Sequence, residues 1–127
     1  MAVSLSPRNL NFKKNLASVY LKLSAYSPSY LFEAKKVTEE TTVLAPTDAK
    51  LSYSLALIAY RLGEREEALG IIDKTIEMKA NYRNARFAKA LILIELGGDE
   101  AAKAELAYIL EKIDPNDNLA REEWEKL

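Results

Sequence analysis

The stretch Asp48–Asn81, DAKLSYSLALIAYRLGEREEALGIIDKTIEMKAN, decides the fold of this chain. Apolar residues recur at helical spacing on both sides of Gly63 and predict two amphipathic helices. They are Leu51, Leu55, Ile58, Ala59 and Leu62 before the glycine, and Ala68, Leu69, Ile72 and Ile76 after it. Gly63 is a typical helix stop, and Glu64, Glu66 and Glu67 suit the positive N-terminal end of a second helix. Neither helix can bury its apolar stripe alone, so the stretch needs neighbours of its own kind.

The same pattern returns when the sequence is shifted by 34 residues. The shift superimposes three sets of three residues, Ala34 with Ala68 and Ala102, Leu23 with Leu57 and Leu91, and Thr38 with Ile72 and Leu106. It also pairs Leu21 with Leu55, Ala25 with Ala59, Tyr26 with Tyr60, and Leu44 with Met78. A helix, turn and helix repeated every ~34 residues is typical of a tetratricopeptide array.

The repeat resembles the tetratricopeptide family, whose pattern reads W-x2-L-G-x2-Y, then A-x3-F, then P. The middle unit has Ser52, Leu55, Ala56, Ala59, Ala68, Ile72 and Ala80 in these slots. The first has Ser18, Leu21, Lys22, Ala25, Ala34, Thr38 and Pro46, and the third has Arg86, Lys89, Ala90, Leu93, Ala102, Leu106 and Asp114. The middle unit matches best, whereas the register of the third drifts by one residue near its end. The resemblance implies an all-α, right-handed superhelical array of three helix-turn-helix pairs plus a C-terminal capping helix. It places the units at about residues 15–48, 49–82 and 83–116 and the capping helix at 118–127, within a single domain of residues 1–127.

Proline, glycine and capping residues mark the expected helix ends. Beyond the two helices of the opening stretch, we expect helices over Pro7–Tyr26, Ser29–Leu44, Tyr82–Leu96, Glu100–Ile113 and Leu119–Leu127. The expected caps are Thr47 or Asp48, then Asn81, then Asp99. The second helix is the weakest because it is rich in β-branched residues, so tertiary packing must hold it. Met1–Ser6 is expected to be a short disordered or extended leader.

A narrower resemblance concerns the context of the chain. Leu44–Leu127 looks like the C-terminal repeat segment of some bacterial O-antigen polymerase or ligase-like membrane proteins, in which stretches like Ser6–Phe12 precede the first repeat. This resemblance implies that the chain is a soluble fragment whose membrane part is missing.

In the tetratricopeptide family the first helix of each pair lines a concave groove. The resemblance therefore implies a partner-binding groove made of Val19, Leu23, Tyr26, Lys50, Tyr53, Leu57, Tyr60, Arg61, Asn84, Phe87 and Leu91, with Leu16, Ile94 and Glu95 beside them. Such a groove would hold an apolar or aromatic peptide or helix, with Lys50 and Arg61 steering acidic groups. The competing interpretation is that the leucines are core between adjacent helices and the tyrosines only cover it. A clamp for two carboxylates is disfavoured, because its usual slots carry apolar residues here.

The function implied is a protein–protein interaction scaffold whose partner is unknown. The alternative is a structural or self-associating module, in which the groove or a terminal helix buries against a second copy.

Composition argues against other classes of function. The chain has no histidine and no cysteine, which removes the commonest general base, thiol catalysis and thiolate metal sites. We therefore expect no catalytic residue, metal or cofactor, and we interpret carboxylates such as Asp73 and Glu105 as solvated. A net charge of −1 gives no general field for nucleic acid, and Arg83, Arg86 and Lys89 are interpreted as a solvated face. We see no signal peptide or membrane-spanning run, and the compartment stays unknown.

Overall fold

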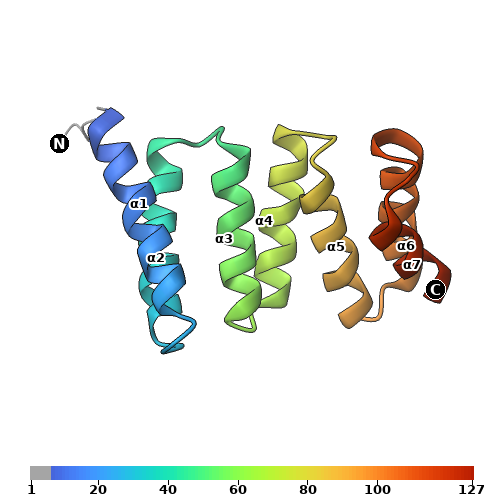
Figure 1. Cartoon of the computed structure of the whole chain (residues 1–127), viewed down its shortest axis with the longest axis horizontal. Helices are drawn as coiled ribbons and strands as arrows, with labels where there is room; N and C mark the ends of the chain where they lie inside the picture. The colour runs from blue at the N-terminus through green and yellow to red at the C-terminus, as the bar shows by residue number, and fades with distance from the viewer. Residues whose placement is uncertain (1–6) are drawn as a thin grey trace. The chain divides into compact units, whose positions relative to one another are not determined.

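The structure is a computed structural model that describes residues 7–127, and the predicted leader Met1–Ser6 lies outside this range. Within it the chain is all-α, without a strand (Figure 1). The helices are α1 (Pro7–Leu23), α2 (Tyr30–Leu44), α3 (Ala49–Arg61), α4 (Arg65–Met78), α5 (Arg83–Glu95), α6 (Asp99–Tyr108) and α7 (Asn118–Lys126). A π-helical turn, η1 (Ile109–Ile113), continues α6.

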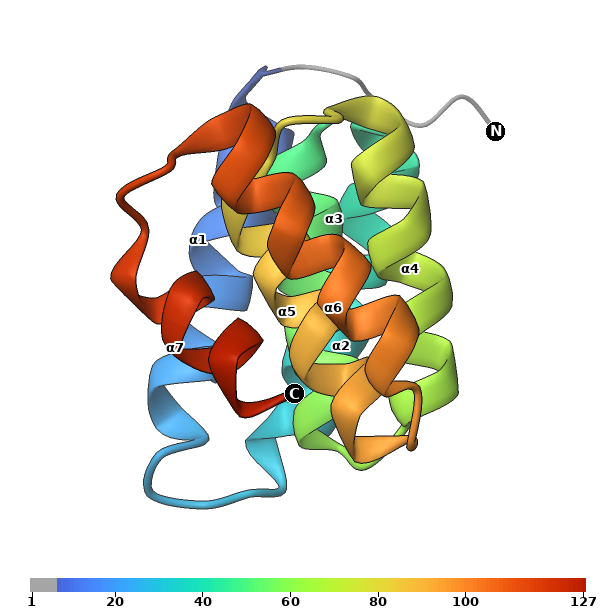
Figure 2. The same cartoon turned by 90° about the vertical axis from the view of Figure 1, so that its right-hand side faces the viewer.

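The chain divides into two compact units, of which the first ends at Ile71 and the second is Ile72–Leu127. In the first unit, α2 packs against both α1 and α3. In the second unit, α6 packs against α5 and against α7 (Figure 2). The prediction of one domain with three repeat units remains a prediction.

Burial repeats with the period of the sequence. Most of the buried residues fall into sets spaced by 34 positions, namely Ala17, Leu51 and Ala85; Ser24, Ile58 and Ile92; Ala34, Ala68 and Ala102; Thr38, Ile72 and Leu106; and Thr41, Thr75 and Ile109. The 34-residue shift therefore detects a repeated core, as expected of a helical repeat array.

Two glycines end their helices as the sequence indicates. Gly63 follows α3 with a φ of +84°, and Gly97 follows α5 with a φ of +83°. This left-handed conformation is costly for residues with a Cβ atom, which explains glycine at both positions.

The predicted caps are confirmed once and wrong twice. Asp48 caps α3, since its carboxylate accepts a hydrogen bond from the Leu51 N–H at 3.0 Å. Asn81 does not cap α5, because that helix begins one residue later and the Asn81 amide instead accepts a hydrogen bond from the Tyr108 hydroxyl at 2.7 Å. Asp99 is the first residue of α6 rather than its cap, and its charge suits that first turn.

The first helix is shorter than predicted, ending at Leu23 instead of Tyr26. The Ser24 hydroxyl donates a hydrogen bond to the Leu21 carbonyl at 2.6 Å, and Pro28 disfavours helical backbone just beyond. Tyr26 consequently lies in a turn with 89% of its surface exposed.

The one-residue drift in the third repeat has a structural counterpart. The Asp114 N–H donates to the Ile109 carbonyl at 2.8 Å, five residues back, so η1 holds one residue more than an α-helical turn. The predicted continuous helix Glu100–Ile113 is thus an α-helix followed by a π-turn. Because of this inserted residue, Asp117 rather than residue 116 caps α7, accepting from the Ala120 N–H at 3.1 Å.

Candidate functional site

An apolar stripe in the first unit runs along α1 and α3 outside the buried core. On α1 it consists of Val19, Leu23 and, just past the helix end, Tyr26; on α3 it consists of Tyr53, Leu57 and Tyr60. Val19 is 49% exposed and Tyr26 is 89% exposed, whereas the other four are partly buried. The two halves are related by the 34-residue shift, so the same surface recurs on consecutive repeats. The leucines of this stripe, Leu23 and Leu57, are not part of the buried core.

Two cations accompany the stripe on α3. Lys50 is exposed, and no carboxylate of the described residues pairs with it. Arg61 is also exposed, and one of its guanidinium N–H groups donates to the Ser24 hydroxyl at 3.3 Å. Arg65 lies over the Tyr60 ring, 5.5 Å from its centre, so one face of that ring is already covered.

The predicted groove residues of the second unit are engaged to different degrees. Asn84 is exposed, and its side-chain oxygen accepts a hydrogen bond from Arg83 at 3.2 Å. Phe87 packs against the core of the unit, and the Arg83 guanidinium covers its ring at 4.5 Å. Leu91 is 36% exposed. Phe87 therefore has a structural role in addition to any role at the surface.

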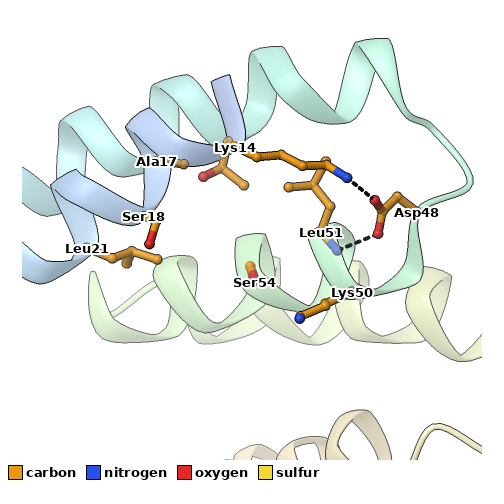
Figure 3. A pocket seen from close by; sticks show the side chains of 9 residues that line it. Lys14, Ala17, Ser18, Leu21, Asp48, Lys50, Leu51 and Ser54 are labelled. Carbon is orange, nitrogen blue, oxygen red and sulfur yellow. Dashed lines mark hydrogen bonds and ion pairs between the residues drawn. The ribbon is translucent and has the colours of Figure 1, made fainter. Parts of the chain in front are cut away.

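A pocket of about 360 Å³ opens between α1 and α3 of the first unit (Figure 3). Residues of α1 form one wall and residues of α3 the other, with Asp48 at one end and Thr38 of α2 also in the lining; the α1 and α3 residues are Lys14, Ala17, Ser18, Leu21, Lys50, Leu51 and Ser54. Only Lys50 of this set belongs to the predicted groove.

Short side chains on the facing helices explain why this pocket exists. Ala17 and Ser18 on α1, and Ser54 on α3, leave space that larger residues would fill. Ser18 stands in the slot where the repeat pattern has tryptophan. Ser52 and Arg86 stand in the same slot of the other units, so the missing tryptophan does not by itself predict the position of the pocket.

An ion pair closes the end of the pocket at Asp48. The Asp48 carboxylate pairs with the Lys14 ammonium at 2.9 Å while it caps α3 (Figure 3). The hydrogen bond from Lys14 is the main reason why the pKa of Asp48 lies below its ordinary value. Burial opposes this shift, and the backbone N–H of Leu51 adds to it. Because Asp48 balances Lys14, the positive charge left over at the pocket is that of Lys50.

The second unit contradicts the interpretation of Arg83, Arg86 and Lys89 as a solvated face. Arg83 forms a bidentate pair with Asp117 at 2.6 and 2.9 Å. Arg86 pairs with Glu105 at 2.9 Å, with both side chains only 13% exposed, and stacks on the Tyr108 ring at 3.6 Å.

Lys89 joins this network through Asp73 at 2.8 Å and Glu105 at 3.4 Å. Burial works against its charged form, but the two carboxylates outweigh burial and raise the pKa of Lys89. The interpretation of Glu105 as solvated is wrong as well, since its side chain is only 13% exposed and pairs with two cations. Asp73 is 52% exposed, as that interpretation expects, although it also pairs with Lys89.

Comparison with known proteins gives solved structures only. No family model matches the sequence, and no curated protein matches it; nothing found supports the narrower resemblance to O-antigen polymerases.

Three solved structures overlie almost the whole chain. The Yersinia enterocolitica type III secretion chaperone SycD, in complex with a peptide of the translocator YopD, is 18% identical with a TM-score of 0.81, covering 98% of this chain and 95% of that one.

The other two structures are similarly close in fold. The first tetratricopeptide domain of Spaghetti (RPAP3), bound to the HSP90 peptide SRMEEVD, is 19% identical with a TM-score of 0.82, covering 98% of this chain and 94% of that one. PcrH, in complex with the chaperone binding region of PopB, is 20% identical with a TM-score of 0.76, covering 99% of this chain and 100% of that one. The chain therefore has the all-α tetratricopeptide-type fold that its 34-residue period predicted.

None of the helices between residues 7 and 127 is long and apolar enough to cross a bilayer.

Proposed function

We propose that this chain is a protein–protein interaction scaffold that binds a peptide or helix on the apolar stripe of α1 and α3. The observation that carries the proposal is the stripe itself. It repeats at the 34-residue period as the core does, yet none of its residues is fully buried. Aromatic and aliphatic residues left outside the core at regular spacing are typical of surfaces that a partner covers.

The structural neighbours support the same proposal. SycD, RPAP3 and PcrH were each solved with a bound peptide, and all three share this fold over nearly their full length. On the second unit, Asn84, Phe87 and Leu91 are proposed to contact a partner as well.

We propose no catalysis for this chain. It contains no histidine and no cysteine. The acids that are least exposed, Glu105 and Asp117, are paired with Arg86 and Arg83 in ion pairs that link helices. A paired carboxylate of this kind is a structural group rather than a proton-transfer group.

The test is a binding selection followed by matched substitutions. Peptides would be selected from a random library on the immobilised chain, and their affinity measured for wild type, Tyr53→Glu and Phe32→Glu. Tyr53 lies in the stripe, whereas Phe32 is an exposed aromatic of α2 outside it, 66% exposed. We expect Tyr53→Glu to weaken binding at least about tenfold, the size of a moderate interface contact. Equal weakening by Phe32→Glu, or none by either, would refute the proposal.

A second candidate function is self-association, favoured by exposed apolar residues elsewhere in the first unit. Phe12 on α1 is 65% exposed, and Phe32 and Val43 on α2 are 66% and 74% exposed. Sedimentation velocity at micromolar concentration would show a dimer that Phe12→Glu or Phe32→Glu dissociates. A monomer over the whole concentration range would remove this candidate.

A further inference from the structure

The pocket between α1 and α3 carries an inference that rests on the proposed function and narrows its ligand. We infer that this pocket takes one aromatic side chain with a polar edge, tryptophan or tyrosine, from a peptide that has a carboxylate beside it. The argument uses the size of the pocket, the chemistry of its walls and the charge at its mouth.

Size and shape favour a single large side chain. The volume of about 360 Å³ is at the small end of the range for ligand pockets, roughly 300–1,000 Å³. The space exists where Ser18 replaces the tryptophan of the repeat pattern. A ring supplied by a partner would occupy the place that the chain leaves empty.

The walls match a ring that is mostly apolar. Ala17, Leu21 and Leu51 supply aliphatic surface, with the hydroxyls of Ser18 and Ser54 on opposite helices (Figure 3). Thr38 completes the lining; it is 1% exposed, and its hydroxyl oxygen is buried without a hydrogen-bond partner. That oxygen is closed to solvent, so the Ser18 and Ser54 hydroxyls are the acceptors that the lining offers to an indole N–H or a phenol O–H.

Charge decides what lies next to the ring. The lining holds the cations Lys14 and Lys50 and the single carboxylate Asp48. Asp48 is committed to Lys14 at 2.9 Å, which leaves Lys50 for an anion of the ligand. Charge complementarity therefore favours an acidic group within a few bonds of the ring.

The experiment uses small probes with the full chain. Amide resonances of the ¹⁵N-labelled protein would be followed during titration with indole-3-acetate, its size-matched analogue 1-naphthaleneacetate, and acetate. We expect indole-3-acetate to shift the resonances of Ser18, Leu21 and Ser54, with naphthaleneacetate weaker and acetate without effect. Failure of indole-3-acetate to shift these resonances, or an equal effect of acetate, would overturn the inference.

Three variants and one control test the space, the charge and the polar edge of the pocket separately. Ser18→Trp should fill the pocket with the chain's own ring and weaken indole-3-acetate binding at least about tenfold, while circular dichroism confirms the fold. Lys50→Met should weaken it about two- to fivefold, the scale of an exposed ion pair, whereas Lys36→Met on α2 should leave it unchanged. Ser54→Ala should reduce the preference for indole over naphthalene.

The outcome is distinguishable from failure of the proposed function. If Ser18→Trp still binds indole-3-acetate as wild type does, the pocket is not the site. Peptide binding that Tyr53→Glu abolishes would then still stand on the stripe alone. Conversely, probe binding in the pocket with no peptide bound by the stripe would refute the broader proposal only.

Discussion

At the scale of single residues, two aspartates do the same double task in different repeats. Asp48 caps α3 and pairs with Lys14 of α1, and Asp117 caps α7 and pairs with Arg83 of α5. In both pairs the cation stands 34 residues before the acid. Each acid therefore ties the start of one helix to a helix of the preceding repeat.

Substitutions at Asp48 separate its two tasks. Asp48→Ala removes both the cap and the ion pair, and we expect it to lower the free energy of unfolding by about 1–2 kcal/mol. Asp48→Asn keeps an acceptor for the Leu51 N–H and loses only a partly exposed pair, so a loss of about 0.5 kcal/mol is expected. Urea denaturation checks both values, and equal losses in the two variants would show that the cap contributes nothing.

The same two acids contribute to the loss of stability at low pH. Arg83 lowers the pKa of Asp117 as Lys14 lowers that of Asp48, below the ordinary value of 3.8 in each case. A group whose pKa is lower in the folded state stabilises the fold above its ordinary pKa, and this stabilisation is lost as the pH falls through the folded value. We expect the urea concentration at the unfolding midpoint to decrease as the pH is lowered below about 4. This decrease should be less steep in an Asp48→Asn, Asp117→Asn double variant. Parallel pH profiles would contradict this assignment.

Thr38 and Thr41 of α2 offer a matched pair of buried hydroxyls. The Thr41 hydroxyl donates to the Val37 carbonyl at 2.6 Å, whereas the Thr38 hydroxyl has no partner. Thr38→Val removes an unsatisfied buried group without changing the volume much, so we expect it to stabilise the chain by about 1 kcal/mol. Thr41→Val should be neutral or destabilising. The difference in urea midpoint between the two variants measures the effect, and a loss of stability in Thr38→Val would refute it.

Residue-level chemistry was the hardest part to predict from sequence. Helical periodicity identifies which residues face inward, but it does not say which cation reaches which acid across helices. Arg86 was therefore assigned to solvent, although it lies against Tyr108 and Glu105. The spacing of 34 between Lys14 and Asp48 is visible in the sequence, but spacing alone does not predict that the two side chains meet.

At the scale of helices, the turns set where each element ends. Gly63 adopts a φ of +84° after α3, while Gly70 lies inside α4 with open space where its Cβ atom would be. The two glycines thus differ in the reason for their presence. The first is required by the backbone, whereas nothing in the structure explains the second.

Alanine substitutions should therefore act in opposite directions. Gly63→Ala forces a Cβ atom into the left-handed region, and we expect a loss of about 1–2 kcal/mol. Gly70→Ala relieves the entropy cost of glycine in a helix, and a gain of about 0.5–1 kcal/mol is expected. Thermal unfolding followed by circular dichroism compares them, and a change of the same sign in both would contradict the argument.

Element boundaries followed from local chemistry where that chemistry was unambiguous. Glycines at the ends of α3 and α5 and the cap at Asp48 were predicted correctly. The predicted starts of α5 and α6 are wrong by one residue, because the residues at the cap positions, Tyr82 and Gly98, make no side-chain cap. The Asn81 side chain instead accepts a hydrogen bond from Tyr108. The π-turn at η1 was visible only as a slip in register.

At the scale of the whole chain, the 34-residue repeat period predicted the fold. The 34-residue shift found the sets that form the repeated core, and solved structures with 18–20% identity share the fold at TM-scores of 0.76–0.82. The pocket was not predicted, because it depends on short side chains that leave space between two helices. A period identifies the regular spacing of apolar residues, whereas the 34-residue shift places Ser18 on another serine, Ser52, and so gives no sign of a cavity.

Ligand binding should appear as added stability of the folded chain. A ligand that binds only the folded state raises the free energy of unfolding by RT ln(1 + [L]/Kd), about 2.7 kcal/mol at a hundredfold excess over Kd. We expect a library-selected peptide to raise the Tm of wild type and of Phe32→Glu by the same amount at equal concentration. Tyr53→Glu, whose stripe carries a charge in place of a ring, should show a smaller rise.

The comparison separates specific binding from a general effect of the peptide. Differential scanning fluorimetry across a range of peptide concentrations gives an apparent Kd for each variant, and these values should agree with direct titration. An increase in Tm that is identical in all three proteins would place the peptide away from the stripe. A rise that saturates in wild type but stays small in Tyr53→Glu would locate the binding surface on α3, because Tyr53 belongs to the stripe and Phe32 does not.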